Sequence, residues 1–210
     1  MVIVAPSIFA GDLSDLRSSL EVIHRSGVSW VHIDAMDGHF VPNLALGPET
    51  VRSLLPYKKN LKFEVHLMLE RPQNFIESFA KAGADRISVH VEASDDPQKS
   101  LAKIRQLGLS AGLALNPETP AETVMSYRPD YYVVMGVHPG FAGQAFIPEV
   151  AEKIQKIHRS DPKIPIEIDG GMNITTAPIC IQRGASFIVA GSAFFRAPDP
   201  QAFVQQLKNE

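Results

Sequence analysis

The stretch Trp30-Val31-His32-Ile33-Asp34-Ala35-Met36 begins with a short apolar run, residues 30–33, and carries polar residues at alternate positions. Side chains alternate between the two faces of a strand, so His32, Asp34 and Met36 share one face if the strand continues to Met36. The opposite face is apolar, as expected for a strand that helices cover. A buried imidazole and carboxylate are costly unless they are paired or bound to something. The stretch therefore predicts a buried strand with a chemically active inner face.

Seven other apolar runs are equally short and rich in Val, Ile and Phe, which favours buried parallel strands over helices. The eight predicted strands are residues 2–5, 30–33, 63–67, 87–89, 111–115, 131–135, 166–168 and 187–190. A helical stretch follows each of them, which predicts a (β/α)8 TIM barrel. The chain of 210 residues is expected to form a single barrel domain, residues 1–210. An open doubly wound sheet is the alternative, disfavoured because residues 7–11 lack the GxGxxG pattern.

The helical stretches show apolar residues at a spacing of three or four. In the first stretch these are Leu13, Leu16, Leu20 and Ile23. Asp12 or Ser14 is expected to cap this helix, and Asp199 to begin the last one. Helices are expected to end at Gly27, Gly83, Gly108 and Gly184.

Composition and charge exclude several classes of protein. The chain has 20 Lys and Arg against 23 Asp and Glu, a net charge of −3, without the basic excess of nucleic-acid binders. Its single cysteine, Cys180, cannot form an internal disulfide. The sequence shows neither a signal peptide nor an apolar run near the roughly 18 residues of a membrane span. We therefore expect a cytoplasmic protein without nucleic-acid or membrane partners.

Polar residues lie where several predicted strands end, the position of catalytic residues in a (β/α)8 barrel. His32 and Asp34 lie on the second strand, His66 on the third, and Asp169 follows the seventh. One such histidine alone is more often structural, but together these residues predict a site for one divalent metal ion. Two imidazoles and two carboxylates suit Zn, Fe(II), Mn or Co better than Ca.

Glycine-rich turns follow the sixth, seventh and eighth strands. They read Pro139-Gly140-Phe141-Ala142-Gly143-Gln144, Asp169-Gly170-Gly171 and Ala190-Gly191-Ser192. In barrels of this kind, backbone N–H groups of such turns bind phosphate. Each turn alone is a weak signal, but together they predict a phosphate site that needs no Lys or Arg.

The sequence contains no GxSxG, Walker A or CxxC motif, and no Lys lies at a predicted strand end. Nucleophilic and Schiff-base chemistry are therefore disfavoured. Carboxylates, a divalent metal and a phosphate site together suit proton abstraction next to a carbonyl, with the metal stabilising an enediolate.

Several longer motifs run in order over the chain. They are Ala5-Pro6-Ser7-Ile8, Met36-Asp37-Gly38-His39-Phe40-Val41-Pro42-Asn43, Val65-His66-Leu67-Met68, Leu115-Asn116-Pro117-Glu118-Thr119-Pro120 and the three glycine turns. On these motifs the chain resembles the ribulose-phosphate 3-epimerase family, (β/α)8 barrels of the ribulose-phosphate-binding type. The stretch of residues 36–43 is the most specific of them.

The resemblance implies a metal-dependent epimerase of the pentose phosphate pathway that acts on D-ribulose 5-phosphate. The family's metal ligands correspond to His32, Asp34, His66 and Asp169. Asp34 and Asp169 would remove the C3 proton and return one to the opposite face, giving D-xylulose 5-phosphate. The implied substrate contacts are Ser7, His66, Met36, Met68, Met135, Gly140, Phe141, Ala142, Gly143, Gly170, Gly171, Gly191 and Ser192. The resemblance also implies a homo-oligomer, a dimer or a hexamer.

The chain departs from the family pattern at His138 for Asn, Ala142 for Gly, Ala35 for a larger aliphatic residue and Glu64 for Asp. Ala142 is expected to be harmless if its φ is negative. His138 is expected to alter the charge or hydrogen bonding of its loop.

Three other functions stay open. The first is D-allulose-6-phosphate 3-epimerase, which runs the same chemistry on a hexulose phosphate. The second is a decarboxylase or aldolase relative, disfavoured because residues 64–69 lack the Asp-x-Lys-x-x-Asp run. The third is a non-catalytic phosphosugar-binding protein, disfavoured because all four candidate ligands are present.

Overall fold

The computed structural model describes residues 2–208, and its eight strands are all parallel. The strands are β1 (Ile3–Pro6), β2 (Trp30–Met36), β3 (Lys62–Met68), β4 (Arg86–His90), β5 (Ser110–Leu115), β6 (Tyr131–Met135), β7 (Ile166–Asp169) and β8 (Phe187–Ala190). Each contains most of a predicted apolar run. β2 extends past its predicted run to include Asp34, Ala35 and Met36, and β3 is one residue longer at each end.

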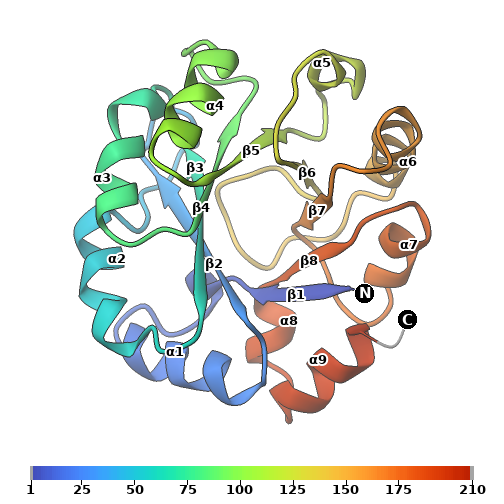
Figure 1. Cartoon of the computed structure of the whole chain (residues 1–210). Coiled ribbons are helices and arrows are strands. Elements are labelled where there is room, and N and C mark those ends of the chain that lie inside the picture. The colour runs from blue at the N-terminus through green and yellow to red at the C-terminus, as the bar shows by residue number, and fades with distance from the viewer. Residues whose placement is uncertain (1, 209–210) are drawn as a thin grey trace.

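The strands form a nearly closed ring, as the view in Figure 1 shows. They pair in the order β1-β8-β7-β6-β5-β4-β3-β2, and a parallel bridge between Ser7 and His32 joins the two ends. This closure confirms the predicted (β/α)8 barrel and contradicts the open doubly wound alternative.

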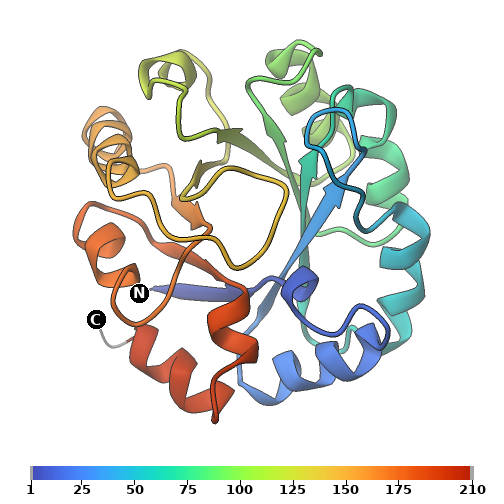
Figure 2. The ribbon, with the colours of Figure 1, turned by 180° about the vertical axis from the view of Figure 1, so that it is seen from behind.

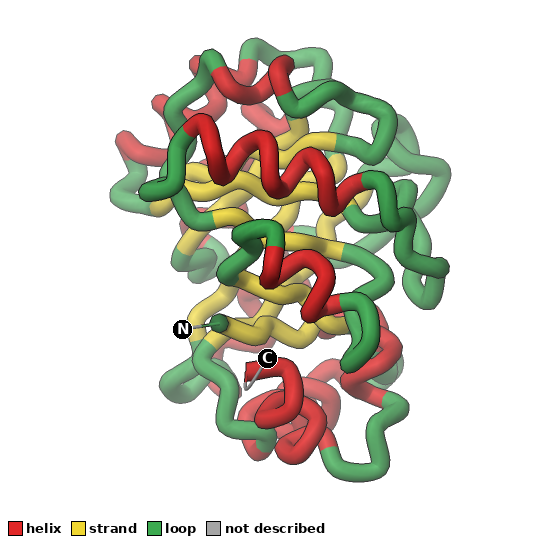
Figure 3. The backbone as a smooth tube through the Cα atoms, turned by 90° about the vertical axis from the view of Figure 1, so that its right-hand side faces the viewer, coloured by secondary structure: helices red, strands yellow, loops and turns green. Residues whose placement is uncertain are grey.

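Helices surround the ring on its outside, seen from behind in Figure 2 and from the side in Figure 3. They are α1 (Leu16–Arg25), α2 (Pro48–Leu54), α3 (Ile76–Lys81), α4 (Pro97–Gln106), α5 (Glu122–Met125), α6 (Val150–Ser160), α7 (Ala177–Gln182), α8 (Ser192–Phe195) and α9 (Pro200–Lys208). Short 3₁₀ turns are η1 (Ile8–Ala10), η2 (Leu55–Tyr57) and η3 (Pro72–Asn74). The prediction of one helix per strand is wrong after β8, which both α8 and α9 follow.

The start of α1 also differs from the prediction. Asp15 caps the helix by accepting a hydrogen bond from the Ser18 N–H at 3.0 Å. The Asp12 carboxylate instead accepts from the Ser14 N–H at 2.8 Å, forming a turn before the helix. Leu13 therefore lies outside α1 and is exposed.

Other predicted helix ends are confirmed. The Asp199 carboxylate accepts from the N–H groups of Gln201 and Ala202, at 2.9 and 3.0 Å, in the first turn of α9. The glycines predicted at helix ends follow α1, α3, α4 and α7 and take φ values from +76° to +112°.

The main apolar core lies between the sheet and the helices. On β3, Phe63, Val65 and Leu67 are fully buried in it. Their neighbours Glu64 and His66 are just as buried but point to the interior of the barrel. Among the described helices, none has the length and apolar character needed to cross a membrane.

Candidate active site

A cavity of about 270 Å³ lies at the C-terminal ends of the strands. Asp34, Asp169 and nearly all the predicted substrate contacts line it: Ser7, Met36, Met68, Met135, Gly140, Phe141, Ala142, Gly143, Gly170, Gly171, Gly191 and Ser192. The exception is His66, which is fully buried beside Asp34 and Asp169. The barrel therefore gathers into one place residues that are far apart in the sequence.

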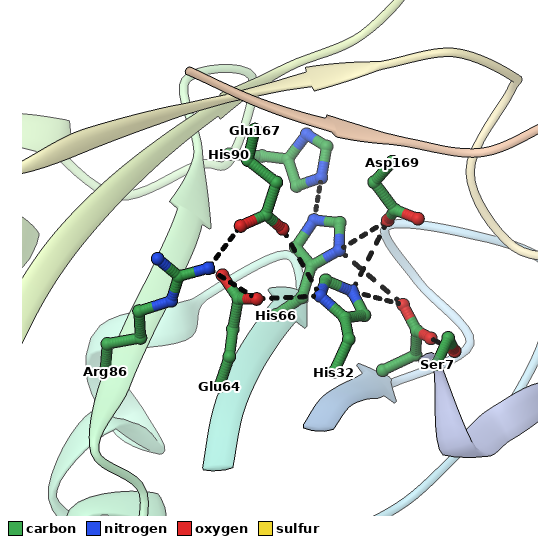
Figure 4. A network of polar contacts seen from close by, with 9 residues as sticks. Ser7, His32, Glu64, His66, Arg86, His90, Glu167 and Asp169 are labelled. Atoms are coloured by element: carbon green, nitrogen blue, oxygen red, sulfur yellow. Dashed lines mark hydrogen bonds and ion pairs between the residues drawn. The ribbon is translucent and has the colours of Figure 1, made fainter. Parts of the chain in front are cut away.

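The four predicted metal ligands meet at this cavity. The register of β2 and β3 places Asp34 beside His66, and β7 supplies Asp169. His32 Nε2 is 3.3 Å from Asp34 Oδ1 and 3.4 Å from Asp169 Oδ2. His66 Nδ1 is 3.6 and 3.3 Å from the same two oxygens (Figure 4). One donor atom from each residue lies within 4.8 Å of all the others.

The donor set fits a divalent metal ion. His66 Nδ1 is buried and has no hydrogen-bond partner among the described residues, although it faces two carboxylates. An orphaned buried nitrogen of this kind is costly unless a ligand occupies its lone pair. Two imidazoles and two carboxylates suit a borderline transition metal. The geometry can therefore hold one ion at the cavity.

The same contacts shift the protonation of these groups. Burial by itself would lower the pKa of His66, but Asp169 and Asp34 outweigh burial and raise it to about 9. Burial would likewise raise the pKa of Asp34, but the contacts with His32 and His66 hold it below its ordinary value. The contacts between the imidazoles and the carboxylates therefore raise the pKa of His66 and lower the pKa of Asp34.

Ser7 orients one of the two carboxylates. Its hydroxyl donates to Asp34 Oδ2 at 2.6 Å, across the point where β1 meets β2. Asp34 Oδ1 is therefore the oxygen that faces His32 and His66.

The glycine turns adopt backbone conformations and close contacts that require glycine. Gly171 takes a φ of +73°, and a Cβ there would lie 2.6 Å from the Phe146 Cα. The Gly140 carbonyl accepts from the Asn43 side chain at 2.7 Å, which ties the loops after β2 and β6 together. These contacts fix the turns around the cavity.

The two departures in the β6 loop have different outcomes. Ala142 does not take a positive φ, because Lys59 is the one non-glycine residue with a positive φ in the described chain. Ala142 therefore meets the expectation that its backbone avoids a positive φ, under which the alanine is harmless. His138 is exposed and lies 2.9 Å from Glu118 Oε1, so it faces a carboxylate outside the lining of the cavity.

The sequence did not reveal a buried ionic cluster below His32. Arg86 contacts Glu167 and lies 2.8 Å from Glu64 Oε2, while His32 Nδ1 is 3.1 Å from Glu64 and 3.3 Å from Glu167 (Figure 4). Burial and the nearby Glu64 raise the pKa of Glu167 above its usual range. The cluster fixes His32 Nδ1 toward carboxylates and leaves Nε2 facing Asp34 and Asp169. Alternation along β3 places Glu64 on the same face as His66 but does not identify its partners.

No sequence motif indicated Arg196, which follows α8 and lines the cavity together with Gly191 and Ser192. It is the one positively charged side chain among the described lining residues. The cavity lining therefore includes a positive charge in addition to the glycine turns.

Comparison with known proteins gives a consistent result. The profile described as the ribulose-phosphate 3 epimerase family matches residues 3–195. A ribulose-phosphate 3-epimerase from Synechocystis sp. is 42% identical, over 99% of this chain and 94% of that protein. The Bacillus subtilis protein of the same name is 41% identical over 99% of both chains.

Solved structures show the same fold. The 3-hexulose-6-phosphate synthase from Salmonella typhimurium superposes with a TM-score of 0.73, covering 100% of this chain and 97% of the other. Its sequence identity is 14%, so this likeness concerns the fold alone.

Proposed function

This chain belongs to the ribulose-phosphate 3-epimerase family and is an isomerase, and from that premise we propose that it interconverts D-ribulose 5-phosphate and D-xylulose 5-phosphate. The observation that carries the proposal is the meeting of Asp34 and Asp169 at one cavity, each beside His32 and His66. With this activity the protein would supply xylulose 5-phosphate or ribulose 5-phosphate within the pentose phosphate pathway.

Inversion at one carbon requires an acid or base on each face of a planar intermediate. In one direction Asp34 takes the C3 proton and Asp169 delivers a proton to the other face. The roles exchange in the reverse direction. The contacts with His32 and His66 lower the pKa of both carboxylates, which suits the one that acts as base, and Ser7 holds Asp34 in place. The carboxylate that acts as acid enters the step protonated.

His32, Asp34, His66 and Asp169 would hold one divalent ion, which we propose is Zn, Fe(II), Mn or Co. When bound, such an ion offsets negative charge that develops on substrate oxygens.

The phosphate group is proposed to bind to the backbone of the turns at Gly140–Gly143, Gly170–Gly171 and Gly191–Ser192. The four methionines of the lining, Met36, Met68, Met135 and Met172, supply an apolar wall. The homo-oligomer that the resemblance implies stays a prediction, and sedimentation of the purified protein measures it.

Arg196→Gln is expected to raise KM for the sugar phosphate about fivefold and leave kcat unchanged, because an exposed charge at the rim contributes modest, uniform binding. The inhibition constant of inorganic phosphate should rise by the same factor. Arg159→Gln, on α6 and outside the lining, is the control and should change neither value. A fall in kcat at constant KM would contradict this role.

Affinity for the divalent ion is expected to rise with pH. The pKa of His66 is raised to about 9 in the metal-free site, so below that pH an incoming ion must displace a proton. Between about pH 6 and pH 8 the affinity should therefore increase at least tenfold per pH unit. Competition with a chromophoric chelator measures it, and a pH-independent affinity would argue against ligation by His66.

Turnover of D-ribulose 5-phosphate and of D-allulose 6-phosphate, each with and without a chelator, tests the proposed function. We expect epimerisation of the pentulose, lost on chelation and restored by added metal. Turnover of the hexulose alone would move the assignment to the allulose enzyme. Absence of turnover on both, with metal present, would favour a binding protein.

A further inference from the structure

A row of polar groups leads away from His66 on the side opposite the carboxylates. His66 Nε2 lies 2.8 Å from His90 Nε2, where β4 ends, and Figure 4 shows the two rings in line. His90 Nδ1 in turn lies 3.1 Å from Glu92 Oε2. The other oxygen of Glu92 accepts from the Asn116 N–H at 2.7 Å and from the Thr119 hydroxyl.

The directions of these hydrogen bonds follow from the chemistry of the last group. An ionised carboxylate can only accept, so His90 carries its proton on Nδ1 and presents a lone pair at Nε2. His66 must then donate from Nε2. Its remaining nitrogen, Nδ1, is the buried atom that faces Asp34 and Asp169 and has no hydrogen-bond partner among the described residues.

The row is firmly held. His90 is fully buried, and its ring lies within 18° of the His66 plane and 4.7 Å from the Phe40 ring centroid. The Lys153 ammonium donates to the carbonyls of Asn116 and Thr119, at 2.9 and 2.6 Å, and so fixes the loop that holds Glu92. Because both histidines are fully buried and hydrogen-bonded in this row, they have little freedom to rotate.

We propose that Glu92 and His90 are positioning residues, which fix the tautomer of His66 so that Nδ1 is free for a divalent ion. Groups that hold the second nitrogen of a ligating histidine orient the ring and raise its basicity. This inference rests on the proposed metal site and extends it beyond the four ligands.

Glu92→Gln tests the proposal because it reverses the direction of the hydrogen bonds from residue 92 through His90 to His66. The new amide keeps its carbonyl for Asn116 and Thr119 and turns its NH₂ toward His90 Nδ1. His90 must then donate from Nε2, and His66 must carry its proton on Nδ1, facing the ion. We expect Zn(II) affinity, measured by competition with a chelator, to fall about 10- to 100-fold. The unfolding midpoint of the metal-free protein should change little.

Glu118→Gln is the matched control. It removes a carboxylate from another pair with an imidazole, 2.9 Å from His138 Nδ1, which is exposed and unconnected to His66. Its Zn(II) affinity should equal that of the unmodified protein. Equal affinity in the Glu92 variant would overturn the proposal.

Nitrogen-15 NMR of the Zn(II)-loaded, unmodified protein measures the tautomers of His66 and His90 directly, without a variant. We expect an Nε2–H tautomer for His66 and an Nδ1–H tautomer for His90. An Nε2–H tautomer for His90 would overturn the positioning role and leave the metal site standing. Failure of His66 to respond to Zn(II) would overturn the metal site and this inference together.

Discussion

Replacing Asp34 or Asp169 with asparagine is expected to lower kcat roughly 10³-fold or more, because each amide removes a proton donor and acceptor from one face of the substrate. Both carboxylates line the cavity and contact His32 and His66. Asparagine has nearly the same shape, so the fold should survive. Initial rates with ribulose 5-phosphate at saturating metal, beside circular dichroism of each variant, make the measurement.

Asp161→Asn, between α6 and β7 and outside the cavity lining, is the control and should retain full activity. The comparison separates loss of an acid from loss of an arbitrary carboxylate. Near-normal turnover in either active-site variant would show that one carboxylate suffices, and the two-residue scheme would be wrong.

Arg86→Met is expected to produce the largest loss of stability. The guanidinium lies against Glu64 and Glu167 inside the barrel, and its carbon is 3.8 Å from the ring centroid of Phe187 and 4.2 Å from that of Tyr131. Methionine preserves apolar packing but removes the guanidinium that the buried carboxyl groups of Glu64 and Glu167 share. We expect the free energy of unfolding, measured by urea titration, to fall by about 3–5 kcal/mol.

Two further variants isolate the cause. Adding Glu64→Gln to Arg86→Met removes one unpaired charge and should recover part of the loss. Arg105→Met breaks a partly exposed pair with Asp130, 3.0 Å apart, and should cost at most about 1 kcal/mol. Equal losses for the two arginines would show that the buried cluster is not specially stabilising.

The sequence predicts most of this fold because its strands are apolar, short and evenly separated. The spacing of apolar residues predicts the helices but does not locate where each helix begins and ends. Leu13 fits the period of α1 but lies outside it, because Asp15 captures the Ser18 N–H and starts the helix later. Local hydrogen bonding, which periodicity ignores, decides such boundaries.

The four candidate ligands could be predicted because their places on strands determine where a barrel brings them. The pairing of Arg86 with Glu167 could not, since it joins residues 81 positions apart and depends on the side chains inside the ring. The contact of His90 with His66 is of the same kind. Arg196 was missed because a side chain after α8 reaches the cavity only through the path of its loop.

The most direct test of the central claim is epimerisation of D-ribulose 5-phosphate in D₂O, with the product analysed by NMR during the first turnovers. Proton removal by one carboxylate and delivery by the other predicts xylulose 5-phosphate that carries deuterium at C3 from the start. Product that retains the substrate's own C3 hydrogen would indicate a single residue moving the proton between faces. That result would contradict the assignment of Asp34 and Asp169 to separate roles.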